Sequence, residues 1–282
     1  MRLVGAITEG SSEVNEDGIG MLGPNENISA AWVFDGVTGI NDKTYLPGGS
    51  DAAWLVGRAH HHLLKLAVTD APLPEILSEL VTALIADWKL EPSALELPSD
   101  YDPPAACLIL AKRYGPGWKV MRLGDSLMLA QSRSGNLTMF EQSPNTSFDN
   151  WLASEAQRRR GQGQYDVNAL LAEFRPQLLA SRKARNTTES FGILKADPAA
   201  ARNAEYMELG YPTRLLLCTD GFYRAVDHYG LYDNASMLEE CCIAGGINNV
   251  LKKLRREEYS DPQCRKYIRF KPSDDASAIA LT

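Results

Sequence analysis

Short apolar runs along the chain predict a protein built largely from β-strands. Most of these runs are rich in branched or aromatic residues and are bounded by glycine, aspartate or proline, which favour turns at strand ends. Strands are expected at 2–7, 29–34, 106–112, 118–123, 126–131, 213–218 and 277–281.

Helical patterns separate the predicted strands in blocks. The clearest covers 74–90, where leucines recur at three- or four-residue steps along one face. Further helices are expected at 51–68, 236–244 and 247–258. Ser50 or Asp51 can cap the first of these. Because strands and helices do not alternate regularly, we expect α+β layers rather than a doubly wound parallel sheet.

The composition is typical of a globular protein of enzyme size. Hydrophobic residues make up 44% and charged residues 23% of the 282 residues, and a chain of this length can bury a core without disulfides. The formal net charge is -7 and the isoelectric point is near 5.2. This balance argues against a nucleic-acid partner, which usually requires a basic surface, and is compatible with an acidic metal-binding pocket.

No apolar run is long enough to span a bilayer, and the first residues lack the apolar centre of a signal peptide, so no membrane partner and a cytoplasmic location are expected. The five cysteines are odd in number and show no CxxC spacing, which indicates reduced thiols used mainly in packing. Without internal repeats or a flexible linker, residues 1–282 are expected to form one domain. Its most polar stretch, 132–186, is either a set of solvated helix ends and loops or a mobile flap over a site.

Several acidic residues stand where an apolar run ends. They are Glu16, Asp17, Asp35, Asp125, Asp220, Asp274 and Asp275. Carboxylates at strand ends are held by a rigid scaffold, and converging carboxylates repel one another unless cations neutralise them. Such hard oxygen ligands suit magnesium or manganese. A single Asp-Gly pair is more often only a turn, so the combination carries the hypothesis.

That combination resembles the protein phosphatase 2C family of metal-dependent serine/threonine phosphatases. The matching motifs occur in the family's order and at compatible spacings, from residue 15 to the end of the chain. They are Asn15-Glu16-Asp17, Val33-Phe34-Asp35-Gly36, Gly124-Asp125-Ser126, Leu215-Leu216-Leu217-Cys218-Thr219-Asp220-Gly221-Phe222 and Asp274-Asp275-Ala276-Ser277. The resemblance implies a four-layer α/β/β/α sandwich with two central antiparallel β-sheets and a two-metal site at one end.

The resemblance also implies roles for individual residues. By position, Asp35 resembles the carboxylate that bridges both metals, and the carbonyl of Gly36 resembles a ligand of one of them. Asp220 and Asp274 resemble ligands of the other metal.

The remaining acidic residues resemble an outer part of the same site. Asp17, with Glu16 beside it, would bind metal directly or through a water. Asp125 resembles the family's contributor, with Asp220, to a weaker third metal.

The implied chemistry is hydrolysis of phosphoserine and phosphothreonine in proteins. Two Mn²⁺ or Mg²⁺ ions lower the pKa of a water, which attacks phosphorus in line with the leaving oxygen. No side chain serves as the nucleophile, and the sequence contains no GxSxG motif of a serine hydrolase. The natural partners are a phosphoprotein substrate and an opposing serine/threonine kinase.

One departure from the family concerns phosphate binding. Ser12 stands where the family usually has an arginine that holds the phosphate, and no Lys or Arg occurs between Arg2 and Lys43. Phosphate must therefore be held by the metals, by one of those two residues, or by a basic residue from 132–186.

Two further departures concern the loop and the charge of the site. Val37-Thr38-Gly39 replaces the family's usual residues after Asp35-Gly36 and leads into an unusual stretch at 40–49, which changes the expected substrate fit. Asp275 replaces the usual asparagine and adds negative charge next to a metal ligand.

Two alternatives to an active protein phosphatase remain open. The altered phosphate position and glycine loop are compatible with a catalytically weakened family member that acts as a binding or scaffold module. The acidic motifs are also compatible with another two-metal phosphoester hydrolase. A nucleotide-binding enzyme is disfavoured because neither GxxxxGK[ST] nor GxGxxG is present.

Overall fold

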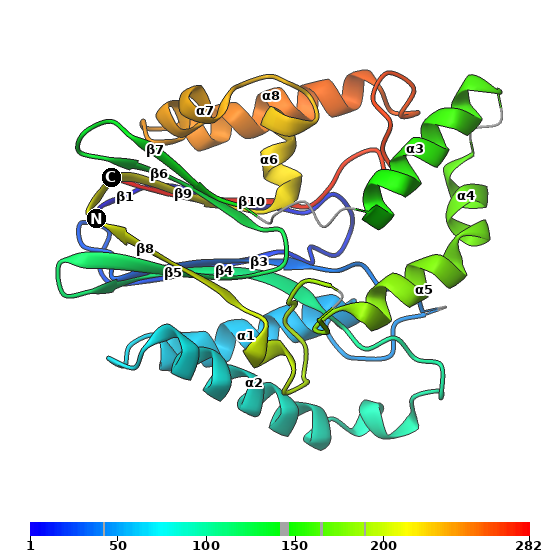
Figure 1. The fold of residues 1–282 in the computed structure, drawn as a ribbon, viewed down its shortest axis with the longest axis horizontal. Helices are drawn as coiled ribbons and strands as arrows, with labels where there is room; N and C mark the ends of the chain where they lie inside the picture. Colours follow the sequence, from blue (N-terminus) through cyan, green and yellow to red (C-terminus); the bar gives the residue numbers. More distant parts are fainter. Residues whose placement is uncertain (42, 142–146, 164–165, 189) are drawn as a thin grey trace.

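Two five-stranded antiparallel sheets lie face to face at the centre of the protein (Figure 1). The computed structural model describes residues 1–41, 43–141, 147–163, 166–188 and 190–282. The first sheet has the order β1 (Leu3–Glu9), β10 (Ala276–Leu281), β9 (Pro212–Cys218), β6 (Leu127–Ser132) and β7 (Leu137–Phe140). The second has the order β2 (Gly18–Leu22), β3 (Ala30–Gly36), β4 (Ala106–Tyr114), β5 (Gly117–Leu123) and β8 (Glu205–Gly210).

Helices cover the outer face of each sheet, which completes the predicted four layers (Figure 1). The second sheet is covered by α1 (Asp51–Leu66) and α2 (Leu73–Leu90). The first sheet is covered by α6 (Asp220–Asp227), α7 (Asn234–Cys241) and α8 (Gly246–Ser260). Two short 3₁₀ turns, η1 (Pro92–Glu96) and η2 (Ala200–Arg202), connect elements of the second side.

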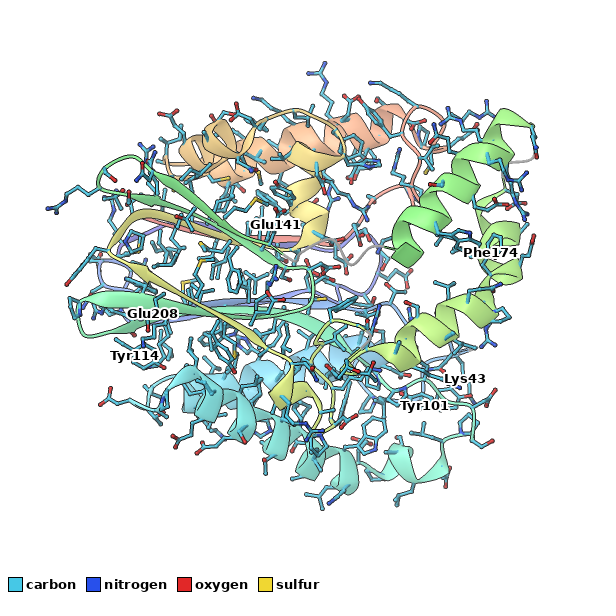
Figure 2. The ribbon with its side chains drawn as sticks, in the orientation of Figure 1. Lys43, Tyr101, Tyr114, Glu141, Phe174 and Glu208 are labelled. Atoms are coloured by element: carbon cyan, nitrogen blue, oxygen red, sulfur yellow. The ribbon has the colours of Figure 1, made fainter. Side chains whose placement is uncertain are left out.

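Three more helices lie at the end of the sandwich where β3 ends and β10 begins (Figure 1). They are α3 (Ser147–Gly161), α4 (Val167–Glu173) and α5 (Arg175–Ala184). Phe174, labelled in Figure 2, packs edge to face on Trp151 of α3 with the ring centres 4.8 Å apart. The predicted polar segment 132–186 thus contains strand β7 followed by these three helices; residues 142–146 and 164–165 of it lie outside the described part.

Successive side chains of β3 point to opposite faces of the sheet and pack into two different hydrophobic cores. Trp32 and Phe34 pack with the helices α1 and α2, whereas Ala31 and Val33 face the space between the sheets. Figure 2 shows side chains from both sheets filling that space. Because both faces of the strand are buried, its sequence is apolar throughout.

The structure confirms all seven predicted strands and the four predicted helices, with ends shifted by a few residues. Ser50 caps α1 as expected, accepting a hydrogen bond from the Ala53 N–H at 3.1 Å. The predictions missed β2, β7, β8 and α6. In β2 the glycines hid the pattern: a Cβ at Gly20 would run into the Trp32 ring, so this position requires glycine.

All five cysteines are free and buried, as predicted. Within the described ranges, none of the helices combines the length and the apolar character needed to cross a membrane.

Candidate active site

Four of the predicted carboxylates surround one cavity. Asp35 lies at the end of β3, Asp125 in the turn between β5 and β6, Asp220 at the start of α6, and Asp274 just before β10. All four line a cavity of about 160 Å³, together with Gly36. Because β3 belongs to one sheet and β9 and β10 belong to the other, both sheets hold the cavity in place.

Asp17 and Glu16 lie beside this cavity, in the segment that leads into β2. Asp17 is buried and accepts a hydrogen bond from the Thr219 hydroxyl at 3.2 Å. Glu16 is also buried, and its carboxylate accepts a hydrogen bond from the Thr38 hydroxyl at 2.7 Å. Glu16 therefore supports the loop after Asp35-Gly36.

Burial and repulsion from neighbouring carboxylates raise the pKa values of Asp35, Asp17 and Asp125. Burial, followed by repulsion from Asp220 and Asp17, raises the pKa of Asp35 well above its ordinary value. Burial likewise raises the pKa of Asp17, against a hydrogen bond from Ser277 that lowers it. Asp125 has a surface open to the cavity, but protein atoms surround the cavity and keep most water away from the carboxylate. This desolvation, followed by repulsion from Asp220, raises the pKa of Asp125 to about 6. The site therefore has more negative charge than its own side chains balance.

The last two predicted carboxylates are already engaged. Asp274 accepts a hydrogen bond from the Arg224 guanidinium at 2.6 Å and forms an ion pair with Lys271. Asp275 accepts hydrogen bonds from the backbone N–H of Ser11 and of Glu16, each at 2.7 Å. The expected extra charge of Asp275 is thus used to fasten the N-terminal loop to the segment before β10.

Two glycines let these segments approach each other. A Cβ at Gly36 would lie 2.5 Å from the Glu16 carbonyl oxygen, closer than real Cβ atoms come. A Cβ at Gly221, next to Asp220, would run into the Asp275 carbonyl oxygen. Glycine is needed at both positions because backbone lies where a side chain would begin.

The residues present fit hard divalent cations by their chemistry. In the part of the chain that is described, no three acidic, histidine or cysteine side chains are already arranged as ligands of one ion. The engagement of Asp274 with two cationic side chains gives a physical reason for this. Asp35, however, lies close enough to Asp220 to be repelled by its charge. Clustered carboxylate oxygens with unbalanced charge are the ligands that Mg²⁺ and Mn²⁺ prefer.

The three residues first considered by name for the phosphate position do not line this cavity. The Ser12 hydroxyl is exposed and donates to the Val14 carbonyl at 2.9 Å. Arg2 exchanges backbone hydrogen bonds with Thr282, and Lys43 lies over the Tyr45 ring at 4.9 Å.

Three polar residues that line the cavity were not predicted individually, although one of them lies in the segment 132–186, which was one expected source of a phosphate-binding cation. These are Cys107, Arg185 and Lys271. Cys107 sits within a predicted strand, and burial, followed by repulsion from Asp125, raises the pKa of its thiol. It is therefore a neutral group and no nucleophile. The two cations had no sequence signal beyond the basic character of 132–186 and the proximity of Lys271 to Asp274.

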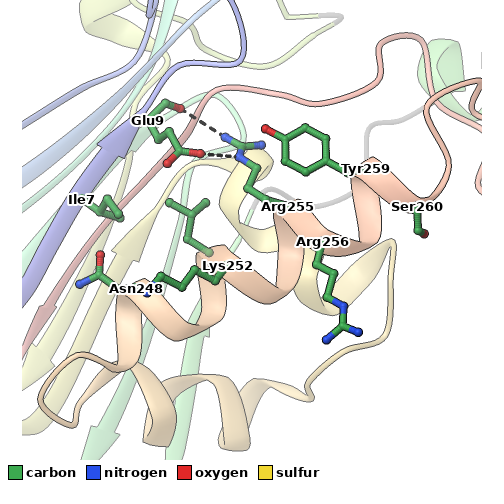
Figure 3. Close-up of a pocket in the computed structure, with 9 residues that line it drawn as sticks. Ile7, Glu9, Asn248, Lys252, Arg255, Arg256, Tyr259 and Ser260 are labelled. Atoms are coloured by element: carbon green, nitrogen blue, oxygen red, sulfur yellow. Dashed lines mark hydrogen bonds and ion pairs between the residues drawn. The ribbon is translucent and has the colours of Figure 1, made fainter.

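A second, larger cavity lies between β1 and α8 (Figure 3). It measures about 640 Å³, and Lys252, Arg255 and Arg256 supply its positive charge. Arg255 is already bound to Glu9 at 2.8 Å and to Glu258 at 2.7 Å. None of the predicted site residues lines this groove.

Comparison with known proteins agrees with the motifs. The sequence model of the family described as protein phosphatase 2C matches residues 4–255, a span that ends before Asp274. No curated protein sequence matches the chain significantly.

Several solved structures share the fold. The serine/threonine phosphatase PstP/Ppp of Mycobacterium tuberculosis is 14% identical, with a TM-score of 0.57 over 98% of this chain and 96% of that one. The catalytic domain of PstP in complex with two manganese ions is 15% identical, with a TM-score of 0.54 over 98% and 95%. The serine/threonine phosphatase Stp1 of Staphylococcus aureus is 13% identical, with a TM-score of 0.52 over 99% and 96%.

Proposed function

This chain belongs to the protein phosphatase 2C family, and on that premise we propose that it is a metal-dependent phosphatase of phosphoserine and phosphothreonine in proteins. The observation that carries the proposal is the cavity lined by Asp35, Asp125, Asp220 and Asp274, whose negative charge is unbalanced. The manganese ions of the similar PstP structure support the choice of divalent metal.

Each carboxylate has a role in this proposal. Two Mn²⁺ or Mg²⁺ ions, when bound, supply the positive charge that activates a water and stabilises the phosphoryl oxygens. Asp35 would hold both ions, with the Gly36 carbonyl on one of them. Asp220 and Asp274 would hold the other ion. To do so, Asp274 would give up its contact with either Arg224 or Lys271.

The outer carboxylates complete the proposed site. Asp17 would bind from the first loop, directly or through a water, while Glu16 keeps the Thr38 loop in place. Asp125 would contribute to a weaker third metal. The nucleophile is water, because the buried neutral thiol of Cys107 and the carboxylates offer no better one.

We also propose the setting in which this activity acts. Carboxylates from both sheets line one cavity, which supports residues 1–282 as one catalytic domain. A phosphoprotein is the proposed substrate and a serine/threonine kinase the opposing enzyme. The five free thiols support a reducing compartment, and we propose the cytoplasm.

The test is hydrolysis of p-nitrophenyl phosphate and of a phosphothreonine peptide by the purified protein with Mn²⁺, Mg²⁺ or EDTA. We expect activity that needs metal and is lost in Asp35→Asn. Asp100→Asn removes an exposed carboxylate that is not part of the cavity lining and should keep full activity. Hydrolysis of neither substrate, with metal shown by calorimetry to be bound, would contradict the proposal.

A second candidate is a phosphatase-like binding module with weakened catalysis. The observation in its favour is that Arg224 and Lys271 are both paired with Asp274. These two side chains would compete with a metal ion for this carboxylate. Binding of a phosphopeptide without its hydrolysis would favour this candidate. Hydrolysis of small phosphoesters but not of phosphopeptides would instead favour a different two-metal phosphoester hydrolase.

A further inference from the structure

A phosphoryl group that enters the cavity must overcome the repulsion of four carboxylates. Bound divalent ions offset part of this charge, and a fixed cationic side chain would offset more. Ser12 offers no charge, and Arg2 and Lys43 lie elsewhere. The cation must therefore come from another part of the chain.

Two cationic side chains line the cavity, Arg185 and Lys271. Lys271 is engaged in an ion pair with Asp274. The Nε of Arg185, in contrast, is buried and has no hydrogen-bond partner. Buried donors are almost always hydrogen-bonded in folded proteins, so an unpaired donor on a side chain that lines a cavity points to a ligand.

The backbone around Arg185 is firmly fixed. Arg185 is the capping residue directly after α5, and the next residue, Asn186, has a φ of 63°. The Asn186 side chain donates to the Ile193 carbonyl at 2.9 Å and accepts from the Ile193 N–H at 2.7 Å. These paired bonds, together with the Asn186 N–H donating to the Phe191 carbonyl at 3.0 Å, fasten Asn186 to Phe191 and Ile193, so the residue next to Arg185 is held in place.

The segment that follows Asn186 is also attached to the sheet that carries Asp125. The Gly192 carbonyl accepts a hydrogen bond at 2.7 Å from the N–H of Gly124, the residue before Asp125. Leu194 pairs with Ala106 of β4. Arg185 and Asp125 are thus mounted on backbone segments that are hydrogen-bonded to each other.

The guanidinium of Arg185 is positioned by an aromatic ring. It lies over the ring of Phe191 at 5.5 Å from the centre, and Phe191 also lines the cavity. Stacking on a ring orients the planar group while leaving its N–H edge open. Arg182, one turn earlier, donates to the Thr38 carbonyl at 2.7 Å and joins α5 to the loop after Gly36.

We propose that Arg185 binds the phosphoryl oxygens of the substrate and of the phosphate product, taking over the role for which Ser12 has no charge. This inference rests on the proposed function. A guanidinium suits the task because its N–H groups can donate in parallel to two phosphate oxygens. The phosphate site would then be assembled from the polar segment 132–186 rather than from the first loop.

The experiment measures phosphate binding apart from turnover. Inorganic phosphate is titrated by calorimetry into the Mn²⁺-loaded protein, and Mn²⁺ into the phosphate-free protein, for the natural chain, Arg185→Gln, Arg185→Lys and Lys183→Gln. Lys183 is an exposed neighbour on α5 and serves as the matched control.

We expect Arg185→Gln to weaken phosphate binding about 10- to 100-fold, the range for loss of a charged hydrogen-bonding partner, without changing Mn²⁺ affinity. Arg185→Lys should recover part of the loss, because it keeps the charge but not the parallel donors. Lys183→Gln should bind phosphate like the natural chain. In hydrolysis, Arg185→Gln should raise the KM for a phosphopeptide.

Three results would overturn this proposal. One is unchanged phosphate affinity in Arg185→Gln, and the second is an equal loss of phosphate affinity in Lys183→Gln. The third is a parallel loss of Mn²⁺ affinity, which would show that Arg185 acts only through the metal site. If Arg185→Gln does not fold, phosphate affinity is compared in Arg185→Lys instead, after its cooperative unfolding transition has been checked.

Failure of the proposed function gives a different pattern. A natural chain that binds phosphate through Arg185 but hydrolyses no ester would contradict the phosphatase and support the anion site. A natural chain that hydrolyses phosphopeptides while Arg185→Gln binds phosphate equally well would contradict the anion site alone.

Discussion

Replacing Gly36 by alanine should separate two segments of the site by a small, calculable amount. The new Cβ would lie 2.5 Å from the Glu16 carbonyl oxygen and 2.9 Å from the Glu16 Cβ. Real Cβ atoms essentially never approach another heavy atom closer than 3.0 Å. The end of β3 and the segment before Asp17 must therefore move apart by about 0.5 Å, because the neighbour is backbone and cannot turn away.

The effect on stability combines two opposing terms. Overpacking of this kind costs about 1–3 kcal/mol, whereas removing a strand glycine gains about 0.5–1 kcal/mol. We expect Gly36→Ala to lower the free energy of unfolding by about 1–2 kcal/mol. The effect on activity should be larger, since displacement of catalytic groups by 1 Å can cost about 100-fold. A 0.5 Å shift of Asp35 relative to Asp17 should lower kcat/KM by about 10-fold or more.

The assay pairs urea unfolding with hydrolysis of p-nitrophenyl phosphate at saturating Mn²⁺. Gly57→Ala is the matched control, because a Cβ at Gly57 in α1 meets no atom within 4 Å. This control should gain up to about 1 kcal/mol of stability from helix propensity and keep full activity. A Gly36→Ala protein as stable and as active as the natural chain would refute the argument.

Three further predictions follow from charged groups. Backbone N–H groups and the Arg269 guanidinium, acting against burial, hold the pKa of Asp261 below its ordinary value. The stability that this carboxylate contributes is therefore present above its unfolded pKa of about 4 and is lost as pH falls through the lower folded pKa. Urea unfolding of Asp261→Asn should show a loss of about 1.5–3 kcal/mol at pH 7 that shrinks in acid; a loss that stays constant below pH 4 would count against this. The raised pKa of Asp125 has the opposite sign, so the metal-free protein should be more stable at pH 5 than at pH 7, and Asp125→Asn should reduce this difference; equal thermal midpoints at both pH values would contradict it. Arg122 is 1% exposed and is paired with Glu205, which water can solvate, so Arg122→Met should change the free energy of unfolding by less than about 1 kcal/mol, and a loss above about 3 kcal/mol would show that the ion pair matters.

The sequence pattern predicted the two-sheet scaffold because most strands are buried on both faces or bounded by turn residues. Leu215, Leu216 and Leu217 of β9, for example, are all fully buried, and such runs stand out. The missed strand β8 is half exposed and carries two glutamates, so its composition is closer to that of a loop. The start of α6 coincides with the Asp220-Gly221 pair, whose turn signal concealed a helix.

The carboxylates of the candidate site were predictable because they stand next to the ends of apolar runs. Asp35 and Asp220 come to the same end of the sandwich because their strands run toward it. That the structure brings Arg185 to the same cavity depends on the bonds between Asn186 and Ile193 and on the bond between Gly192 and Gly124, which lie 68 residues apart in the sequence. The partners of Asp274 and Asp275 are equally long-range and leave no local pattern.

The cavity can be completed only after β10 has paired with β1. β10 forms its ladder between β1 and β9, and Asp274 lies just before β10. While the chain is being synthesised, residues 1–260 can leave the ribosome and begin to fold, but the cavity has no fourth carboxylate until residues 274–281 emerge. A nascent chain that has not yet reached Asp274 should therefore be inert toward phosphoproteins, however much of the preceding chain has folded.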